Sequence, residues 1–377
     1  MKKELLFLLI FMVLVSGCGN STPSESIDTQ TVVTSSLDSV EETVVFEEVQ
    51  SEERVVTDCY GYEINVPVEL KSISTNYQSA TQIMLMLGGE KIITGTSPKT
   101  IARPWVQLIY PEFCQTVSCP YDQNNEFNVE ELLKQKPELF LSYNTSDTEL
   151  VRNAGITTAN IGLYDYPGIE TSILKIGEIM GEVYFQKAQE WDTYYQERLS
   201  LVQERVSDIP EDEKVRVLFL RGDFERTYGQ DSVISSWINL AGGINVLDGL
   251  ESKESIVMPS AEEILGSNPD LIIIGDTSSY TKAYETITTD ERFTGMDVIV
   301  NNKILFNPNG VHQWEKYSGE IALQLLWAGK TFYPERFEDI DLIEETKYFY
   351  KTFHNFTLTD EQAQLMIDGK TPDGGRT

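Results

Sequence analysis

The feature of this sequence that most constrains its fold is an internal repeat. Residues 129–141 read VEELLKQKPELFL and residues 261–273 read AEEILGSNPDLII, so each position of the first segment has a counterpart 132 residues later. In both copies a short helical stretch precedes a proline, which cannot continue a helix, and an apolar run suited to a buried strand follows. Helix–proline–strand connections are common in α/β proteins, but the matched acidic pairs favour a true repeat. The sequence therefore predicts two similar α/β halves.

Around this repeat, short apolar runs alternate with helical stretches along most of the chain. Such alternation is typical of parallel sheets flanked by helices. A proline-free stretch rich in Glu, Gln, Lys and Leu over residues 169–206 predicts one long helix, with a possible break at Gly181. We therefore predict an α/β fold of two Rossmann-like lobes bridged by a single long α-helix. The expected units are an N-terminal lobe at 55–168 that opens with a hairpin, an interlobe helix at 169–210, and a C-terminal lobe with closing helices at 211–377.

The charge balance restricts the partners that this chain can bind. It has 29 basic and 60 acidic residues, which gives a net charge of −31. Such a surface repels nucleic acids and anionic headgroups, because phosphate binding requires clustered Lys and Arg. The acidity is also a common solubility device. With 41% hydrophobic residues the chain can form a globular body, so we expect a folded protein and exclude a nucleic-acid-binding function.

The first residues indicate export. Lys2 and Lys3 precede an apolar run at 5–15 that is too short to span a bilayer, and Val-Ser-Gly-Cys follows at 15–18. Small residues before a cysteine at this place resemble a bacterial lipobox, in which the cysteine is lipidated. The alternative is an ordinary signal peptide with a chance cysteine. We predict a signal peptide at 1–17, lipidation of Cys18, a disordered acidic linker over 18–54, and an extracytoplasmic protein that is lipid-anchored to the outer face of the bacterial cell membrane.

Several segments of the body, in this order, resemble one known family. They are the Asp58-x-x-Gly61 hairpin before Pro67, the two repeat segments, Tyr228-Gly229 followed by LAGGIN at 240–245, and LLWA at 325–328 followed by YPE at 333–335. Over residues 55–340 the chain is similar to substrate-binding proteins of ABC importers for iron-siderophores, haem, cobalamin and related metal chelates.

This resemblance implies a function and a set of partners. We expect a monomer, without catalytic residues or a required cofactor, that captures a metal chelate between its lobes and delivers it to a permease and ATPase complex. The resemblance also implies that one acidic residue on each lobe docks against basic residues of the permease. By position these residues are Glu130 and Glu262.

Ligands of open α/β sheets bind beyond the carboxyl ends of the strands, so we expect the ligand in the loops that follow the predicted strands. Aromatic side chains suit flat or catecholate-type chelates, and Arg suits their anionic charge. His312 lies in a glycine-containing loop where a neutral imidazole could also ligate a metal directly, whereas His354 is expected to be structural. The candidate ligand-binding residues are Tyr77, Arg103, Trp105, Arg221, Tyr228, Trp237, His312 and Trp314.

The residues leave other functions open. These are a direct receptor for a bare metal ion, an enzyme acting on a chelate, and a surface adhesion or sensor lipoprotein. The sequence has no G-x-S-x-G, H-E-x-x-H, P-loop or G-x-G-x-x-G motif, which speaks against the common enzyme classes. Cys114 and Cys119 could close a small disulfide loop or remain free thiols, and with Cys59 the body holds an odd number of cysteines.

Overall fold

The computed structural model describes residues 52–162, 166–221, 226–251, 255–275 and 280–376. The chain separates into two units, Met1–Val49 and Gln50–Thr377, and the fold described below is that of the second unit. The predicted signal peptide, Cys18 and the predicted linker up to residue 51 lie outside the described residues. Among the helices that are described, none combines the length and apolar character needed to cross a membrane.

The body opens with the predicted hairpin. Strands β1 (Glu53–Thr57) and β2 (Glu63–Pro67) pair antiparallel and bury alternate residues on one face. The Arg54 guanidinium donates to the backbone carbonyl of Glu178, at 2.8 Å, and to that of Ile179. These carbonyls lie in the last turn of a helix, where they have no partner within the helix and a cation is favourable. The hairpin is thereby fixed to the end of that helix.

The N-terminal lobe is a four-stranded parallel sheet with the strand order β4-β3-β5-β6. Its strands are buried along almost their whole length, as expected of a sheet covered on both faces. The strands are β3 (Ile73–Thr75), β4 (Ile93–Gly95), β5 (Leu139–Ser142) and β6 (Thr158–Asn160). The helices are α1 (Gln78–Met86), α2 (Pro98–Ile101), α3 (Pro104–Ile109), α4 (Pro111–Thr116), α5 (Val129–Gln135) and α6 (Thr145–Asn153).

The C-terminal lobe has a second four-stranded parallel sheet, with the order β12-β11-β7-β9. Its strands are β7 (Arg216–Leu220), β9 (Ile244–Asn245), β11 (Leu271–Ile274) and β12 (Ile304–Phe306), and β8 (Thr227–Tyr228) and β10 (Ile256–Val257) form a small antiparallel pair. The helices are α9 (Val233–Leu240), α10 (Ala261–Ser267), α11 (Tyr280–Thr289), α12 (Asp297–Val300), α13 (Ile321–Phe332), α14 (Leu342–Phe353) and α15 (Asp360–Ile367), with 3-10 turns at Glu211–Glu213 and Pro334–Arg336.

The two sheets have the same connectivity, which confirms the prediction of two similar halves. In each, the first strand (β3 or β7) lies between the second (β4 or β9) and the third (β5 or β11), and the fourth (β6 or β12) lies beyond the third. The repeated segments form α5–β5 and α10–β11. Both helices end on a residue in the left-handed region, Lys136 (φ 48°) and Asn268 (φ 42°), immediately before the proline.

The acidic residue after each proline connects the third strand to the first. The Glu138 carboxylate accepts from the backbone N–H of Lys71, at 2.6 Å, and from that of Ser72, at 3.2 Å. In the other lobe the Asp270 carboxylate accepts from the Arg216 N–H at 2.9 Å. This contact explains why both repeats keep an acid at this position.

Removing this contact should weaken the N-terminal lobe. We expect Glu138→Ala to lower the free energy of unfolding by about 1 kcal/mol, because two backbone N–H groups lose a charged acceptor close to solvent. Chemical denaturation measures this difference. Glu149→Ala, at an exposed position of α6, is the control and should change stability by much less. Equal stabilities for the two variants would contradict this role of Glu138.

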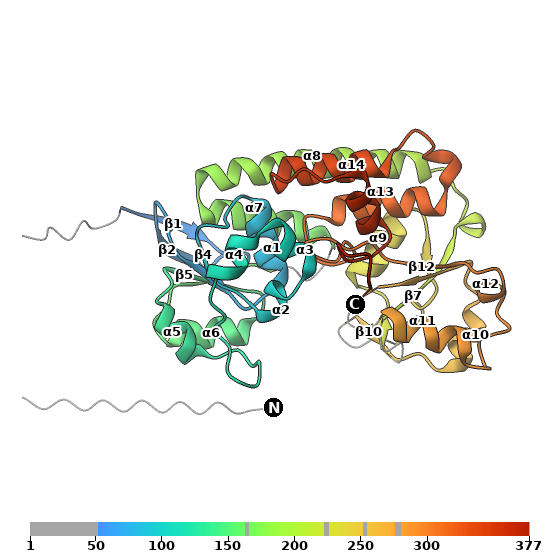
Figure 1. Ribbon diagram of the computed structural model, residues 1–377, viewed down its shortest axis with the longest axis horizontal. Coiled ribbons are helices and arrows are strands. Elements are labelled where there is room, and N and C mark those ends of the chain that lie inside the picture. Colours follow the sequence, from blue (N-terminus) through green and yellow to red (C-terminus); the bar gives the residue numbers. More distant parts are fainter. Residues whose placement is uncertain (1–51, 163–165, 222–225, 252–254, 276–279, 377) are drawn as a thin grey trace, which may run out of the picture. The chain divides into compact units, whose positions relative to one another are not determined.

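The predicted single helix over 169–206 is in fact two helices, α7 (Tyr166–Met180) and α8 (Glu182–Val206). The break is at Gly181, as the sequence suggested, with a φ of 124° that favours glycine. The chain turns back there, because α7 and α8 pack against each other and a Cβ on Gly177 would stand 2.7 Å from that of Ala188. Only α8, at 25 residues and about 37 Å, can bridge the lobes, and in Figure 1 it runs past both sheets.

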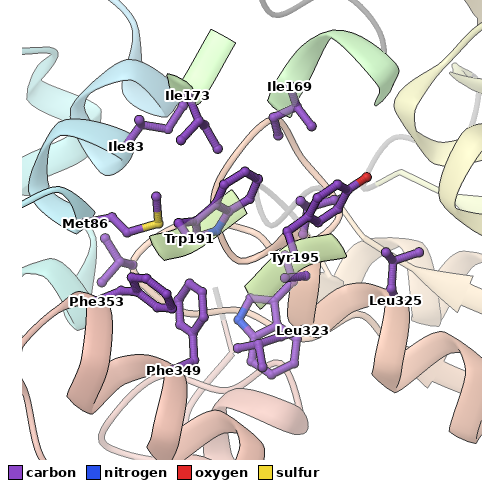
Figure 2. Packing of buried hydrophobic residues seen from close by; sticks show 14 of the residues in the cluster. Ile83, Met86, Ile169, Ile173, Trp191, Tyr195, Leu323, Leu325, Phe349 and Phe353 are labelled. Atoms are coloured by element: carbon purple, nitrogen blue, oxygen red, sulfur yellow. The ribbon is translucent and has the colours of Figure 1, made fainter. Parts of the chain in front are cut away.

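The main hydrophobic core is continuous across both lobes and is centred on α8. Trp191 and Tyr195 of α8 stack with their ring centroids 5.1 Å apart, and residues of α1, α13 and α14 surround them (Figure 2). The Trp191 indole also donates to the carbonyl of Gly319 at 3.0 Å. Because the lobes share this packed core, we expect their relative motion to be small.

The three cysteines of the body, Cys59, Cys114 and Cys119, are free thiols. Burial raises the pKa of each, for Cys59 to about 11, so all three remain protonated and unreactive near neutral pH.

Candidate functional site

Six partly buried side chains from both lobes and from one connecting loop form a connected group, which we call the interlobe cluster. The loop is residues 307–320, between β12 and α13. The cluster consists of Tyr77 and Tyr143 from the N-terminal lobe, Arg221 and Tyr228 from the C-terminal lobe, and Lys316 and Tyr317 from the loop. All six are half-buried, as side chains that contact a ligand must be.

The N-terminal half of the cluster follows from the sheet topology. Tyr77 comes two residues after β3 and Tyr143 directly follows β5, and these strands are neighbours in the sheet. The carboxyl ends of parallel neighbours meet at one edge, so the two rings stack, with centroids 4.1 Å apart and planes 28° apart. Burial raises the pKa of Tyr77, and the nearby Tyr317 raises it further while Lys316 lowers it. The phenol is therefore protonated and able to donate a hydrogen bond.

The C-terminal half brings two cationic side chains close to one aromatic ring. The Arg221 guanidinium, which directly follows β7, lies 5.2 Å from the centroid of the Tyr228 ring. The Lys316 ammonium lies 4.2 Å from the same centroid and donates to the Tyr228 hydroxyl. Cations over an aromatic face are held by the negative charge of that face. This half therefore places two cationic side chains beside one ring.

The loop over 307–320 is hydrogen-bonded to the N-terminal lobe. Arg103 donates to the side-chain oxygens of Asn309, at 2.9 Å, and Gln313, at 3.1 Å. On α1, Gln82 accepts from the backbone N–H of Gly319 at 3.1 Å. Burial lowers the pKa of Arg103, but a guanidinium this basic stays charged. The sequence predicted Arg103 as a ligand contact, and the structure places it in a contact between the lobe and the loop.

His312, predicted as a possible metal ligand, has hydrogen-bond partners at both ring nitrogens. Nδ1 accepts from the Gln313 backbone N–H at 2.8 Å, so the proton is on Nε2, which faces the Ser79 hydroxyl at 3.3 Å. Burial and the charge of Arg103 lower the pKa of His312 well below its ordinary value, which keeps the ring neutral. Within the part of the chain that the structure describes, no three His, Cys, Asp or Glu side chains are grouped to hold a metal. The geometry makes His312 a link between lobe and loop rather than a metal site.

Three of the predicted ligand contacts are corrected by their burial. Trp105, Trp237 and Trp314 are at most 1% exposed. The Trp105 indole donates to the carbonyl of Lys370 at 2.9 Å, and Trp237 packs edge-on against Phe219. Indole rings gain more from burial than other side chains do, so tryptophans near strand ends are readily taken into the core.

Sequence reasoning missed half of the interlobe cluster. Tyr143 directly follows β5, so it lies at the same strand-end edge as Tyr77. Lys316 and Tyr317 lie two and three positions after Trp314, a predicted ligand contact in the same loop. The lysine and tyrosine next to that residue are the sequence signal by which they could have been identified. Tyr164, Asp276 and Thr277, in other loops that follow predicted strands, lie outside the described residues.

A fully buried carboxylate lies next to the loop. The Glu320 side chain, 0% exposed, accepts from the backbone N–H of His312 at 2.8 Å and from the Tyr350 hydroxyl. Burial raises the pKa of Glu320 to about 7, although these two donors and the charge of Arg103 act in the opposite direction. No signal in the sequence marks this residue, because its partners are provided by tertiary packing.

His354 is buried, as the prediction of a structural role requires. Its Nδ1 lies 2.7 Å from the Tyr110 hydroxyl and its ring stacks on Tyr350 with centroids 4.9 Å apart. A pocket of about 640 Å³ borders His354 and Tyr110, and none of the interlobe cluster residues line it.

The predicted docking residues occupy equivalent exposed positions. Glu130 is the second residue of α5 and Glu262 the second residue of α10. The other acid of each pair has a local partner: Glu131 pairs with the Lys134 ammonium at 2.6 Å, and Glu263 accepts from the Ser260 N–H at 2.7 Å. These contacts stabilise the first turn of each helix, and Glu130 and Glu262 are exposed beside them.

Comparison with known proteins agrees with this architecture. The molybdate-binding protein MolA of Haemophilus influenzae is 24% identical over 82% of this chain and 93% of its own length. A cobalamin-binding protein of Halobacterium salinarum is 25% identical over 58% of this chain and 57% of its own length. Among solved structures, a periplasmic solute binding protein from Veillonella parvula superposes with a TM-score of 0.74 at 23% identity, covering 84% of this chain and 97% of that one.

The profile of one family matches residues 73–309, which span both sheets and most of the connections between them. The matched region includes both repeat segments, α7 and α8. Four of the six residues of the interlobe cluster lie within it, and Lys316 and Tyr317 lie just beyond its end at Asn309. By this match the chain belongs to the periplasmic binding protein family.

Proposed function

We propose that this protein is the extracytoplasmic solute-binding component of an ABC importer, and that it holds a small anionic ligand at the interlobe cluster. The observation that carries the proposal is the chemistry of that cluster: two cations and four phenols from both lobes, on a chain whose net charge is −31. Cationic and hydroxyl donors bind anionic oxygens, and phenol rings stack on flat groups.

The ligand class that fits best is an anionic metal chelate. Stacked Tyr77 and Tyr143 offer an aromatic surface, and Arg221 and Lys316 offer charge, which together match a flat chelate with peripheral oxyanions. A bare tetrahedral oxyanion such as molybdate is the second candidate, because the MolA likeness extends over 93% of that protein. A bare metal cation is disfavoured, since Arg221 and Lys316 would repel it.

Delivery requires contact with a permease and its ATPase, and Glu130 with Glu262 provides one exposed acid on each lobe for this contact. Lipidation of Cys18 would hold the protein, as a monomer, at the membrane that contains this complex. The linker after Cys18 is long and acidic, so it would extend and let the body reach the permease.

The ligand can be identified directly. We expect native mass spectrometry and absorbance spectra of the protein purified from its own host to show one small bound molecule per chain, which organic extraction releases. The stripped protein is then titrated with a ferric catecholate, sodium molybdate, cobalamin and nickel chloride. Preferential binding of nickel ion over every anion would sink the assignment of an anionic ligand, and turnover of the bound molecule would favour an enzyme.

Lys316 should matter for affinity more than for folding. We expect Lys316→Ala to weaken binding of the anionic ligand by roughly tenfold, because one charge-assisted contact is lost. Isothermal titration calorimetry measures this change. Lys347→Ala removes an equal charge from α14, where the ammonium pairs with Glu344 and Asp360, and should leave affinity unchanged. If both variants bind like the wild type, the interlobe cluster is not the ligand site.

A further inference from the structure

Helices α5 and α10 each carry an exposed leucine one turn after the exposed glutamate. Leu133 and Leu265 lie 132 positions apart, so they occupy the same place in the two repeats. Their exposed fractions are 41% and 42%. The preceding residues, Leu132 and Ile264, are 0% and 1% exposed. Both repeats therefore bury one apolar residue and expose the next.

A single exposed leucine is ordinary on a protein surface and indicates nothing by itself. The informative observation is that both leucines share a helix face with the proposed docking glutamate. Residues three apart on a helix are neighbours, so Glu130 lies beside Leu133 and Glu262 beside Leu265. Each lobe thus presents one carboxylate and one apolar side chain with the same spacing.

We propose that Glu130 with Leu133 and Glu262 with Leu265 form two copies of one docking patch, each of which binds a basic residue beside an apolar recess on the permease. This inference rests on the proposed function as an importer component. Because the patches are alike, the partner that fits them presents two like surfaces, as two copies of one membrane subunit do. In Figure 1, α5 and α10 lie along the same edge of the body, opposite α8, so a single partner surface can meet both helices.

The leucine adds an apolar contact to the patch, which a carboxylate alone cannot provide. An exposed ion pair in water contributes little, because solvent screens the charges. An apolar side chain that fills a recess next to the pair removes water from it and strengthens the attraction between the charges. The leucines should therefore affect how long the complex lasts, while the glutamates also affect how fast it forms.

The test uses the full-length protein and the permease–ATPase complex of the same host, held in lipid nanodiscs. We expect L133A/L265A to raise the dissociation constant by roughly tenfold, mainly through faster dissociation, in biolayer interferometry. Ligand affinity and melting temperature should stay at wild-type values, because both leucines are exposed. L133M/L265M should restore binding, because methionine keeps the apolar volume.

Two further variants separate the possible outcomes. V183A/V300A shortens two other exposed apolar side chains, 75% and 69% exposed, and should bind within twofold of the wild type. If L133A/L265A binds like this control while E130A/E262A is weakened, the leucines have no docking role but the proposed function stands. If L133A/L265A and E130A/E262A both bind like the wild type, α5 and α10 do not dock, and the delivery step of the proposed function is wrong as well.

Discussion

The double variant E130A/E262A is expected to bind its ligand with wild-type affinity and to support less than a tenth of wild-type import. Both glutamates are exposed in the first turns of α5 and α10, and neither helix contributes a residue to the interlobe cluster. Loss of one partner from a desolvated charge pair typically costs about 2 kcal/mol or more, so the loss of two should weaken docking by roughly a hundredfold or more. Import of radiolabelled ligand by cells or proteoliposomes measures the effect.

The chain offers a matched control for this experiment. Glu112 and Glu361 are exposed glutamates in the first turns of α4 and α15. E112A/E361A therefore removes the same charge and the same favourable interaction with two helix termini, but from helices outside the repeat. Import by this control should match the wild type. Normal import by E130A/E262A, or equal loss by both double variants, would remove the docking assignment.

The fold was predictable from the sequence where local chemistry determines it. Proline at 137 and 269 ends each short helix, and the apolar run after it forms a buried strand of a sheet. The two equivalent halves can therefore be predicted from a few residues. Gly181 correctly marked a break. The direction of the chain after it could not be predicted, because that depends on the close packing of Gly177 against α8.

The candidate site was predictable only in part, since strand order and burial decide which side chains meet. Tyr77 and Tyr228 were found because they lie at or near strand ends in chain order. Tyr143 meets Tyr77 only because β3 and β5 are neighbours in the sheet. The 63 residues 76–138 separate these two strands along the chain, so no local pattern reveals that they pair. Trp314 was expected at the ligand, but its apolar area is better placed in the core.

Glu320→Gln should change how stability depends on pH. Glu320 is fully buried, and its pKa in the folded protein is raised to about 7 from an ordinary value of 4.5. Between these two values the carboxyl is protonated in the folded state and ionised in the unfolded state, so the folded state binds the additional proton. The contribution of Glu320 to stability is therefore complete below pH 4.5 and is lost as the pH rises through 7.

Glutamine resembles the protonated carboxyl and cannot ionise, so E320Q should escape this loss. We expect the variant and the wild type to be similarly stable near pH 4.5, and the variant to become more stable by up to roughly 3 kcal/mol at pH 8. Urea denaturation at a series of pH values measures the difference between the two proteins, in which the titration of groups common to both, such as His354, largely cancels. E335Q, at an exposed position, should follow the wild-type curve throughout. Parallel curves for E320Q and the wild type would show that the pKa of Glu320 is the same in the folded and the unfolded protein, so that the Arg103 charge and the two hydrogen-bond donors balance the cost of burying the carboxylate.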